Sequence, residues 1–399
     1  MNAESLVPNY NRLSRYNRLI ADSRFAALTG NSGVDIIVWP RCGPICAKEG
    51  TVRISTLMNY AAGFKDSADE IALLEKAGLD VVWVPEAYAF DAPSTMGYLA
   101  AKTERIEIAS GVMPIYTRTP TVLAMTAAGV DALSGGRCML GIGAGGPQVM
   151  EGFHGVPFNA PTARIREIID ICRKVWRREK LEHQGRHYKM PLPADQGTGL
   201  GIPLKLINHP VRDEIPIAVA ALGQMSVEMT AELADAWLPA FYMAEGAEKI
   251  WGEALAKGQQ MRDRNRAPLE IFAGGGVAIG EGTEHLRDLS RPQMALYVGG
   301  MGARDKNFYN DIFSQYGYEA EAEKIQDLYL SGKKKEAEAA IPQQFLDASS
   351  LIGAEGFVRD RLAAYKESGV TALNVSFMGS TQEERVKQCE ELRRIVDTL

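Results

Sequence analysis

Glu86 is an acidic side chain that the sequence places at the end of a predicted strand. The apolar segment from Leu79 to Pro85 precedes it. A carboxylate in this position is costly unless a hydrogen-bond donor meets it. A ring N–H or a substrate hydroxyl would serve, and so would a structural Arg such as Arg118 or Arg137. Glu86 is therefore a candidate either for ligand binding or for a buried ion pair.

His154 is the only histidine close to a glycine-rich strand end. It could take part in catalysis, or it could pack against Phe153 in a loop. No Ser-His-Asp order, G-x-S-x-G turn, H-E-x-x-H motif or Cys/His cluster stands out. A site with neither a nucleophile nor a metal suits hydride transfer, because an organic cofactor then performs the difficult step and the protein orients it.

A glycine-rich loop, GIGAGGPQ at residues 141–148, ends the predicted strand from Cys138 to Ile142. It is similar to a dinucleotide fingerprint, but its third glycine is misplaced. Pro147 also lacks the N–H that would help to hold a phosphate. Glycines in this loop would let the backbone approach a flat ring closely, or they would form a tight turn.

A candidate phosphate site lies at Gly223, within AALGQMS at residues 220–226. The predicted strand from Ile215 to Ala221 breaks at Gly223 directly into a helix that begins at Gln224. The first N–H groups of a helix are unpaired and lie at its positive end, which suits a phosphate. A simple helix start is the alternative.

Strands that are apolar on both faces alternate with amphipathic helices from Val52 onward, which predicts a parallel sheet covered by helices. Eight such units favour a closed (β/α)₈ TIM barrel over an open sheet, with the chemistry at the C-terminal ends of the strands. The expected strands are 52–58, 79–85, 106–112, 138–142, 215–221, 236–240, 270–279 and 370–377. The expected helices are 64–77, 93–102, 119–133, 162–178, 224–234, 245–264, 356–368 and 381–398.

Three stretches are expected to lie outside the eight repeating units. Residues 1–50 hold no sustained apolar period and are predicted to be a loosely ordered N-terminal extension to a barrel domain at 51–399. Residues of about 183–214 and about 280–355 are predicted to be insertions. Both insertions are expected at the C-terminal face of the barrel, where loops build the site.

The composition predicts a soluble enzyme that binds neither nucleic acid nor a membrane. Of the 399 residues, 46% are hydrophobic and 24% are charged, and the formal net charge is −6. This balance lacks the basic footprint of nucleic-acid binding, and no run of about 18 apolar residues could span a bilayer. No secretory signal is evident and the five scattered cysteines form no disulfide framework, so a cytoplasmic location is expected.

Six segments resemble the luciferase-like F420-dependent oxidoreductases of the bacterial luciferase superfamily in order, spacing and barrel position. They are MNYAAGF (58–64), VVWVPEAYAFDAPS (81–94), ASGVMPIYTRTP (109–120), LSGGRCMLGIGAGGPQVMEGFHGVPF (133–158), AALGQMSVEMTAELADAWLP (220–239) and AEGFVRDRLAAYKESGVTALNV (354–375). The resemblance covers residues 52–398 and implies coenzyme F420, a deazaflavin, as the cofactor.

The resemblance also implies where the cofactor binds. Family members bend the third strand through a non-proline cis peptide, forming a bulge behind the middle ring, and Gly111-Val112 occupies that position. Glu86 matches an acidic residue at the polar edge of the ring, and Gly223 matches the segment whose N–H groups bind the phosphate. The implied cofactor-binding residues are Glu86, Gly111, Val112, Gly143, Gly145, Gln148, Gly223 and Gln224.

Two positions depart from the sugar-phosphate dehydrogenases of this family. Those enzymes have a His after the acidic residue and a Glu in the fourth-strand loop, where this chain has Ala87 and Gly146. Oxidation of glucose 6-phosphate is therefore not expected. The chain looks more like the reductases that are grouped with methylenetetrahydromethanopterin reductase.

The preferred hypothesis is an F420-dependent oxidoreductase that transfers a hydride between C5 of the deazaflavin and a small organic substrate. Tyr88, Tyr116 and His154 are the candidates to bind this substrate or to supply a proton. The alternative is an FMN-dependent monooxygenase of the same fold that uses O₂. A non-catalytic binding protein is a third hypothesis, and the family leads us to expect a homodimer.

Overall fold

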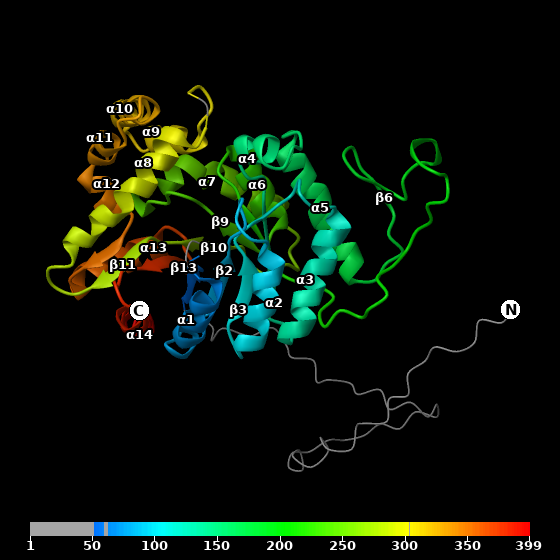
Figure 1. The fold of residues 1–399 in the computed structure, drawn as a ribbon, viewed down its shortest axis with the longest axis horizontal. Coiled ribbons are helices and arrows are strands. Elements are labelled where there is room, and N and C mark those ends of the chain that lie inside the picture. Colours follow the sequence, from blue (N-terminus) through cyan, green and yellow to red (C-terminus); the bar gives the residue numbers. More distant parts are fainter. Residues whose placement is uncertain (1–51, 60–62, 303) are drawn as a thin grey trace, which may run out of the picture. The chain divides into compact units, whose positions relative to one another are not determined.

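Eight parallel strands close into a barrel in the computed structural model, which describes residues 52–59, 63–302 and 304–399 (Figure 1). The hydrogen-bonded order is β1-β2-β3-β5-β8-β9-β10-β13, and β1 pairs with β13 to close the circle. The predicted TIM barrel is thereby confirmed. Its strands are β1 (Arg53–Leu57), β2 (Val81–Val84), β3 (Glu107–Ser110), β5 (Cys138–Gly143), β8 (Ile217–Ala220), β9 (Ala236–Leu238), β10 (Glu270–Ala273) and β13 (Ala372–Phe377).

Helices surround the strands, and several begin at the capping residues that their sequences provide. Asp91 and Thr119 each accept a hydrogen bond from a backbone N–H of the helix that follows, and Thr381 forms a capping box with Glu384. The surrounding helices are α1 (Phe64–Lys76), α2 (Ala92–Lys102), α3 (Pro120–Ser134), α4 (Pro147–Gly152), α5 (Pro161–Trp176), α6 (Gln224–Leu233), α7 (Ala244–Met261), α13 (Glu355–Glu367) and α14 (Gln382–Val396).

The strands are buried on both faces, as their apolar sequences predict. Trp83 fills the barrel interior, where its ring meets Phe272 edge-on at 5.1 Å and its Nε1 donates to Ser55 Oγ at 2.9 Å. Val81, Ala109, Met139, Ala218, Ala236 and Ala372 complete this inner cluster. The opposite faces of the strands pack against the helices in a larger core. The interior is therefore filled, and ligands must bind at an end of the barrel.

The segment at 183–214 was predicted at the C-terminal face, and this prediction is wrong. The segment connects the end of α5 to the start of β8, so both of its ends lie at the N-terminal face. Arg212 anchors it there, because its guanidinium binds the Asp131 carboxylate and the carbonyl of Cys138, the first residue of β5. Its regular elements are β6 (His183–Gln184), β7 (Lys189–Met190) and η1 (Ala194–Gln196).

The predicted strand at 270–279 is in fact two strands, β10 and β11 (Gly276–Ile279). Gly274 and Gly275 separate them, and a Cβ at Gly275 would lie 1.9 Å from the carbonyl oxygen of Ser349. β11 pairs with the end of β13 and with β12 (Leu351–Gly353), a short strand that was not predicted.

The chain between β11 and β12 leaves the sheet at the C-terminal end of β11 and forms a group of helices (Figure 1). This cap has its own apolar core, in which Phe313 and Phe345 lie 4.6 Å apart. The elements of the cap are η2 (Glu284–Ser290), α8 (Arg291–Gly300), α9 (Phe308–Gln315), α10 (Glu319–Leu330), α11 (Lys334–Ala339) and α12 (Gln343–Ala348).

The predicted extension, residues 1–50, lies outside the described residues. Among the helices that are described, none is long and apolar enough to cross a membrane.

Candidate active site

The third barrel strand carries a bulge where it runs beside β5. Ala109 pairs with Met139, but Met113 in β4 (Met113–Pro114) pairs with Ile142, so the third strand has one extra residue between these pairs. The peptide bond between Gly111 and Val112, inside this interval, is cis. The predicted non-proline cis peptide and bulge are therefore confirmed.

The glycines of β5 are required by this bulge. A Cβ at Gly141 would lie 1.8 Å from the carbonyl oxygen of Ser110, and one at Gly143 would lie 2.7 Å from Cγ2 of Val112. Ser110 Oγ donates to the Gly141 carbonyl at 2.7 Å and accepts from its N–H at 2.9 Å, which replaces ladder bonds that the bulge interrupts. Gly141 and Gly143 thus allow a close approach between two strands, and their predicted approach to a flat ring stays a prediction.

Glu86 forms the buried ion pair that was one of its two predicted roles. Its carboxylate accepts from both terminal nitrogens of Arg118, at 2.5 and 2.9 Å, and from the N–H of Ala92 at 2.9 Å. Both charged side chains are largely buried. The pair ties the end of β2 to the start of α2 and to the loop after β4. Ala87, next in the chain, has a φ of +43°, which a non-glycine residue adopts at a cost.

Tyr88, Phe153 and His154 lie together, on the loops after β2 and β5. The Tyr88 and Phe153 rings are 6.2 Å apart, and Phe153 meets His154 edge-on at 5.1 Å. The Tyr88 and Phe153 side chains are each 67% exposed. His154 packs against Phe153, as one reading predicted, but its Nε2 is buried and has no hydrogen-bond partner in the described part of the chain. A ligand atom that reached this nitrogen would supply its missing hydrogen-bond partner.

Tyr116 lies apart from these three residues in its contacts. Its hydroxyl donates to the Asn159 carbonyl at 2.8 Å, and its ring packs 5.4 Å from Phe158 and beneath the Arg164 guanidinium. Burial raises the pKa of the Tyr116 phenol. Because the hydroxyl hydrogen of Tyr116 is donated to Asn159, the residue can contact a ligand through its ring but is poorly placed to supply a proton.

The loop after β5 carries the two remaining predicted cofactor residues of this region. Gly145 has a φ of +68°, and a Cβ there would lie 3.1 Å from Cε of Met150. Gln148 lies in the first turn of α4, two residues after Gly146, the N-cap of that helix. The left-handed turn at Gly145 allows the chain to leave β5 and enter α4 within a few residues.

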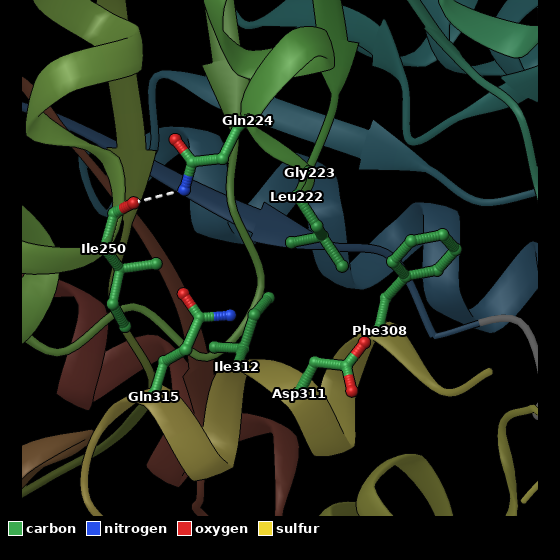
Figure 2. Close-up of a pocket in the computed structure, with 8 residues that line it drawn as sticks. All are labelled: Leu222, Gly223, Gln224, Ile250, Phe308, Asp311, Ile312 and Gln315. Atoms are coloured by element: carbon green, nitrogen blue, oxygen red, sulfur yellow. Dashed lines mark hydrogen bonds between the residues drawn. The ribbon is translucent and has the colours of Figure 1, made fainter. Parts of the chain in front are cut away.

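Gly223 and Gln224 line a cavity of about 210 Å³ (Figure 2). Gly223 is the N-cap of α6, and the N–H groups of Gln224 and Met225 meet no acceptor among the described residues. The side-chain amide of Gln224 donates to the Ile250 carbonyl at 2.5 Å and so is held beside the cavity. Unpaired amides at the positive end of a helix, opening on a cavity, suit an anion.

Helix α9 of the cap closes the other side of this cavity (Figure 2). This contribution of α9 was not predicted, because the cap shows no strand–helix rhythm and lies far from Gly223 along the chain. The one signal in the sequence was the predicted position of the insertion at the C-terminal face of the barrel. The cap residues that line the cavity are Phe308, Asp311, Ile312 and Gln315.

The predicted residues therefore lie at the C-terminal ends of neighbouring strands. In barrel order, β2 carries Glu86, β3 and β4 carry the bulge, β5 carries the glycine loop and β8 leads to Gly223. The described residues include no group of three or more His, Cys, Asp or Glu side chains that could hold a metal ion. The donors that are present, unpaired amides and an unpartnered imidazole nitrogen, fit an anionic organic cofactor and its substrate.

Comparison with known proteins identifies the family of this chain. Residues 51–372 match the family model for luciferase-like monooxygenases. A Mycobacterium tuberculosis protein, provisionally named a coenzyme F420-dependent oxidoreductase, is 39% identical over 324 residues, which cover 80% of this chain and 93% of that protein.

More distant relatives share the fold. The 5,10-methylenetetrahydromethanopterin reductase of Archaeoglobus fulgidus is 24% identical over 75% of this chain and 86% of its own. The structure of the coenzyme F420-dependent tetrahydromethanopterin reductase of Methanopyrus kandleri superposes with a TM-score of 0.72 at 19% identity, covering 86% of this chain and 98% of its own. The match to the family model and the 39% identity together show that this chain belongs to the luciferase-like monooxygenase family.

Proposed function

We propose that this protein is an F420-dependent oxidoreductase that acts on a small organic substrate. The observation that carries the proposal is the bulge of the third strand at Gly111-Val112, with the glycines of β5 packed against it. Support also comes from the relatives, since the named M. tuberculosis protein and the M. kandleri reductase are both described as F420-dependent.

In this proposal the deazaflavin ring lies against Gly111 and Val112, and its phosphate binds the N–H groups at Gly223 and Gln224. Gly143, Gly145 and Gln148 line the stretch between, since β5 separates the bulge from β8 in the barrel. Bound F420 would supply a hydride carrier at C5. The protein then has to orient the substrate, exclude water and handle one proton.

His154 is the residue we propose for the proton. Its buried, unpartnered Nε2 can donate to or accept from a substrate heteroatom. Tyr88 would pack against the substrate through its exposed ring, and Tyr116 would offer its ring while Asn159 holds its hydroxyl. Glu86 is proposed as a positioning residue, which holds the strand end beside the cofactor through Arg118.

Cofactor titration tests the proposal directly. F420 and FMN would be added separately to the purified protein and binding followed by cofactor fluorescence. We expect tight binding of F420 and much weaker binding of FMN. Tight FMN binding without F420 binding would overturn the proposal. The family's description as monooxygenases favours the alternative in that case, and substrate-dependent O₂ uptake with reduced FMN would establish it.

A His154→Gln substitution tests the proposed proton donor. Loss of a positioned general acid typically costs about 100-fold or more in rate, so kcat should fall by that order while the Kd for F420 is unchanged. His187→Gln is the matched control, because the Nε2 of His187 is also buried and unpartnered among the described residues, but its backbone is bound to Glu167 of α5. Equal losses in the two variants would exclude this role for His154.

The remaining assignments concern the whole protein. We propose a homodimer in the cytoplasm, with residues 1–50 as an extension outside the barrel domain. The cysteines at 138, 172 and 389 support a reducing environment, since all three are free thiols buried in the core. Light scattering on the full chain and on a chain that lacks residues 1–50 tests the dimer and the dispensability of the extension together.

A further inference from the structure

Among the described residues that line the cavity beside Gly223, Asp311 is the only charged one. Its carboxylate has no ion-pair or hydrogen-bond partner in the described part of the chain, although its backbone N–H donates to the Asn307 carbonyl. Burial raises the pKa of its carboxyl, and no neighbouring cation acts in the opposite direction. A carboxylate without a cation is unexpected here, because the N–H groups of α6 on the opposite side of the cavity suit an anionic ligand.

The helix dipole of α9 explains why an acidic residue occurs at position 311. It does not explain why the side chain points toward the cavity. Asp311 lies in the first turn of α9, where a negative side chain favours the helix dipole. Other positions of that turn would serve the dipole equally well. Figure 2 shows the Asp311 carboxylate on the side of α9 that faces the Leu222–Gln224 turn.

A phosphate bound at Gly223 would therefore experience two opposing fields. The N-terminus of α6 attracts it, and the Asp311 carboxylate repels it. Exposed charges are largely screened from one another beyond about 10 Å at ordinary ionic strength. A cavity of about 210 Å³ keeps any phosphate inside it within that distance of the exposed Asp311. Lys249 Nζ donates to the carbonyl of Gln315, another residue that lines the cavity, and forms no ion pair with Asp311.

The repulsion depends on the charge of the phosphate. A phosphomonoester, as in FMN, carries about −1.5 to −2 near pH 7. The phosphate of F420 is a diester, and it can carry only one negative charge at that position. Coulomb energy is proportional to ligand charge, so the Asp311 carboxylate penalises the monoester more than the diester.

We propose that Asp311 is a specificity-determining residue that selects a phosphodiester deazaflavin over the phosphomonoester FMN. The inference rests on the proposed function, and in particular on the phosphate binding at Gly223. In this proposal a residue of the cap, and not of the barrel strands, discriminates between the two kinds of phosphate.

The test compares Asp311→Asn with the unsubstituted protein in four fluorescence titrations: FMN, riboflavin, F420 and its phosphate-free fragment FO. The ratio of FMN to riboflavin affinity isolates the phosphomonoester, and the ratio of F420 to FO affinity isolates the diester with its attached tail. We expect Asp311→Asn to raise the first ratio about tenfold and the second about threefold or less. Glu323→Gln, which removes an exposed charge from α10 of the same cap, should change neither ratio.

The outcomes separate the inference from the proposed function. Equal changes in the two ratios, or no change in either, would overturn the role of Asp311. So would equal affinities for F420 and FO in the unsubstituted protein, since the phosphate would then not be recognised, while F420 dependence would stand. Failure to bind F420 at all would overturn both. Asp311→Ser provides a second neutral variant if the Asn variant does not fold, as judged by circular dichroism.

Discussion

The bulge at Gly111-Val112 and the cavity at Gly223 belong to the same end of the barrel but are built in different ways. The bulge is formed by backbone atoms of neighbouring strands, and a single added carbon at Gly141 would meet a carbonyl oxygen. The cavity is formed by a helix start on one side and by side chains of α9 on the other. The bulge requires glycine residues, which have no Cβ atom. The cavity is lined by side chains, which can be exchanged.

If the proposed function holds, this difference divides the task of binding the cofactor between the two regions. The strand pair would recognise a ring by its shape. The cavity would recognise a phosphate and its substituents by charge and hydrogen bonds, which the cap can adjust. Substitutions at the bulge should therefore affect folding first, and substitutions at the cavity should affect ligand choice first.

Gly141→Ala should have the largest effect. Its Cβ would lie 1.8 Å from the Ser110 carbonyl oxygen, a backbone atom that cannot move without breaking the bulge. We expect a loss of more than about 4 kcal/mol in the free energy of unfolding, enough to prevent folding of most domains. Soluble yield and urea denaturation measure it. The control is Gly129→Ala in α3, where a Cβ meets nothing within 4 Å and about 0.5–1 kcal/mol should be gained.

Arg118→Met should have the next largest effect, because it leaves the Glu86 carboxylate buried without its cation. Breaking a buried pair in this way typically costs about 3 kcal/mol or more. Urea denaturation should show this loss, and adding Glu86→Gln should recover much of it. A loss below about 1 kcal/mol would mean that the pair behaves as a surface ion pair.

Gly143→Ala should destabilise the protein by about 1–3 kcal/mol, the usual cost of overpacking. The clash is with a side chain, Cγ2 of Val112 at 2.7 Å, and not with backbone. Val112→Ala should therefore rescue the variant, and a double-mutant cycle in thermal denaturation would measure the coupling. Additive effects of the two changes would contradict the contact.

Tyr316→Phe should have the smallest effect, which should be confined to the cap and to the start of α7. The Tyr316 hydroxyl accepts from the N–H of Met243 at 2.9 Å, and its removal leaves that N–H unpaired at about 1–2 kcal/mol. Hydrogen exchange should increase in α9 and at the start of α7, with no change in β3 or β5. Faster exchange in those strands would show that the cap and the bulge are not independent.

The strand–helix rhythm was enough to predict the barrel, since its strands are buried on both faces and its helices are capped by recognisable residues. The position of Gly223 between a strand and the start of a helix was also predicted correctly, because the glycine itself marks this junction in the sequence. The partner of Glu86 was not decided by sequence, because Arg118 is distant along the chain and a cofactor atom would satisfy the same carboxylate.

The errors have a common physical origin. The segment at 183–214 was assigned to the wrong face because its composition resembles that of an active-site loop, although its place after a helix fixes its ends at the opposite face. The break at Gly274-Gly275 was hidden inside an apolar run. Asp311 could not be predicted at all, since its importance comes from a contact between the cap and the barrel.

The apolar core of the cap has a consequence for protein engineering. Apart from Met243, the buried residues that pack with Phe313 and Phe345 come from the segment between β11 and β12, so this segment carries much of its stability with it. Grafting this segment between the corresponding strands of a relative would transfer the α9 side of the cavity as a unit. Cofactor preference would then become a property that can be moved between barrels by exchanging one continuous stretch of a gene.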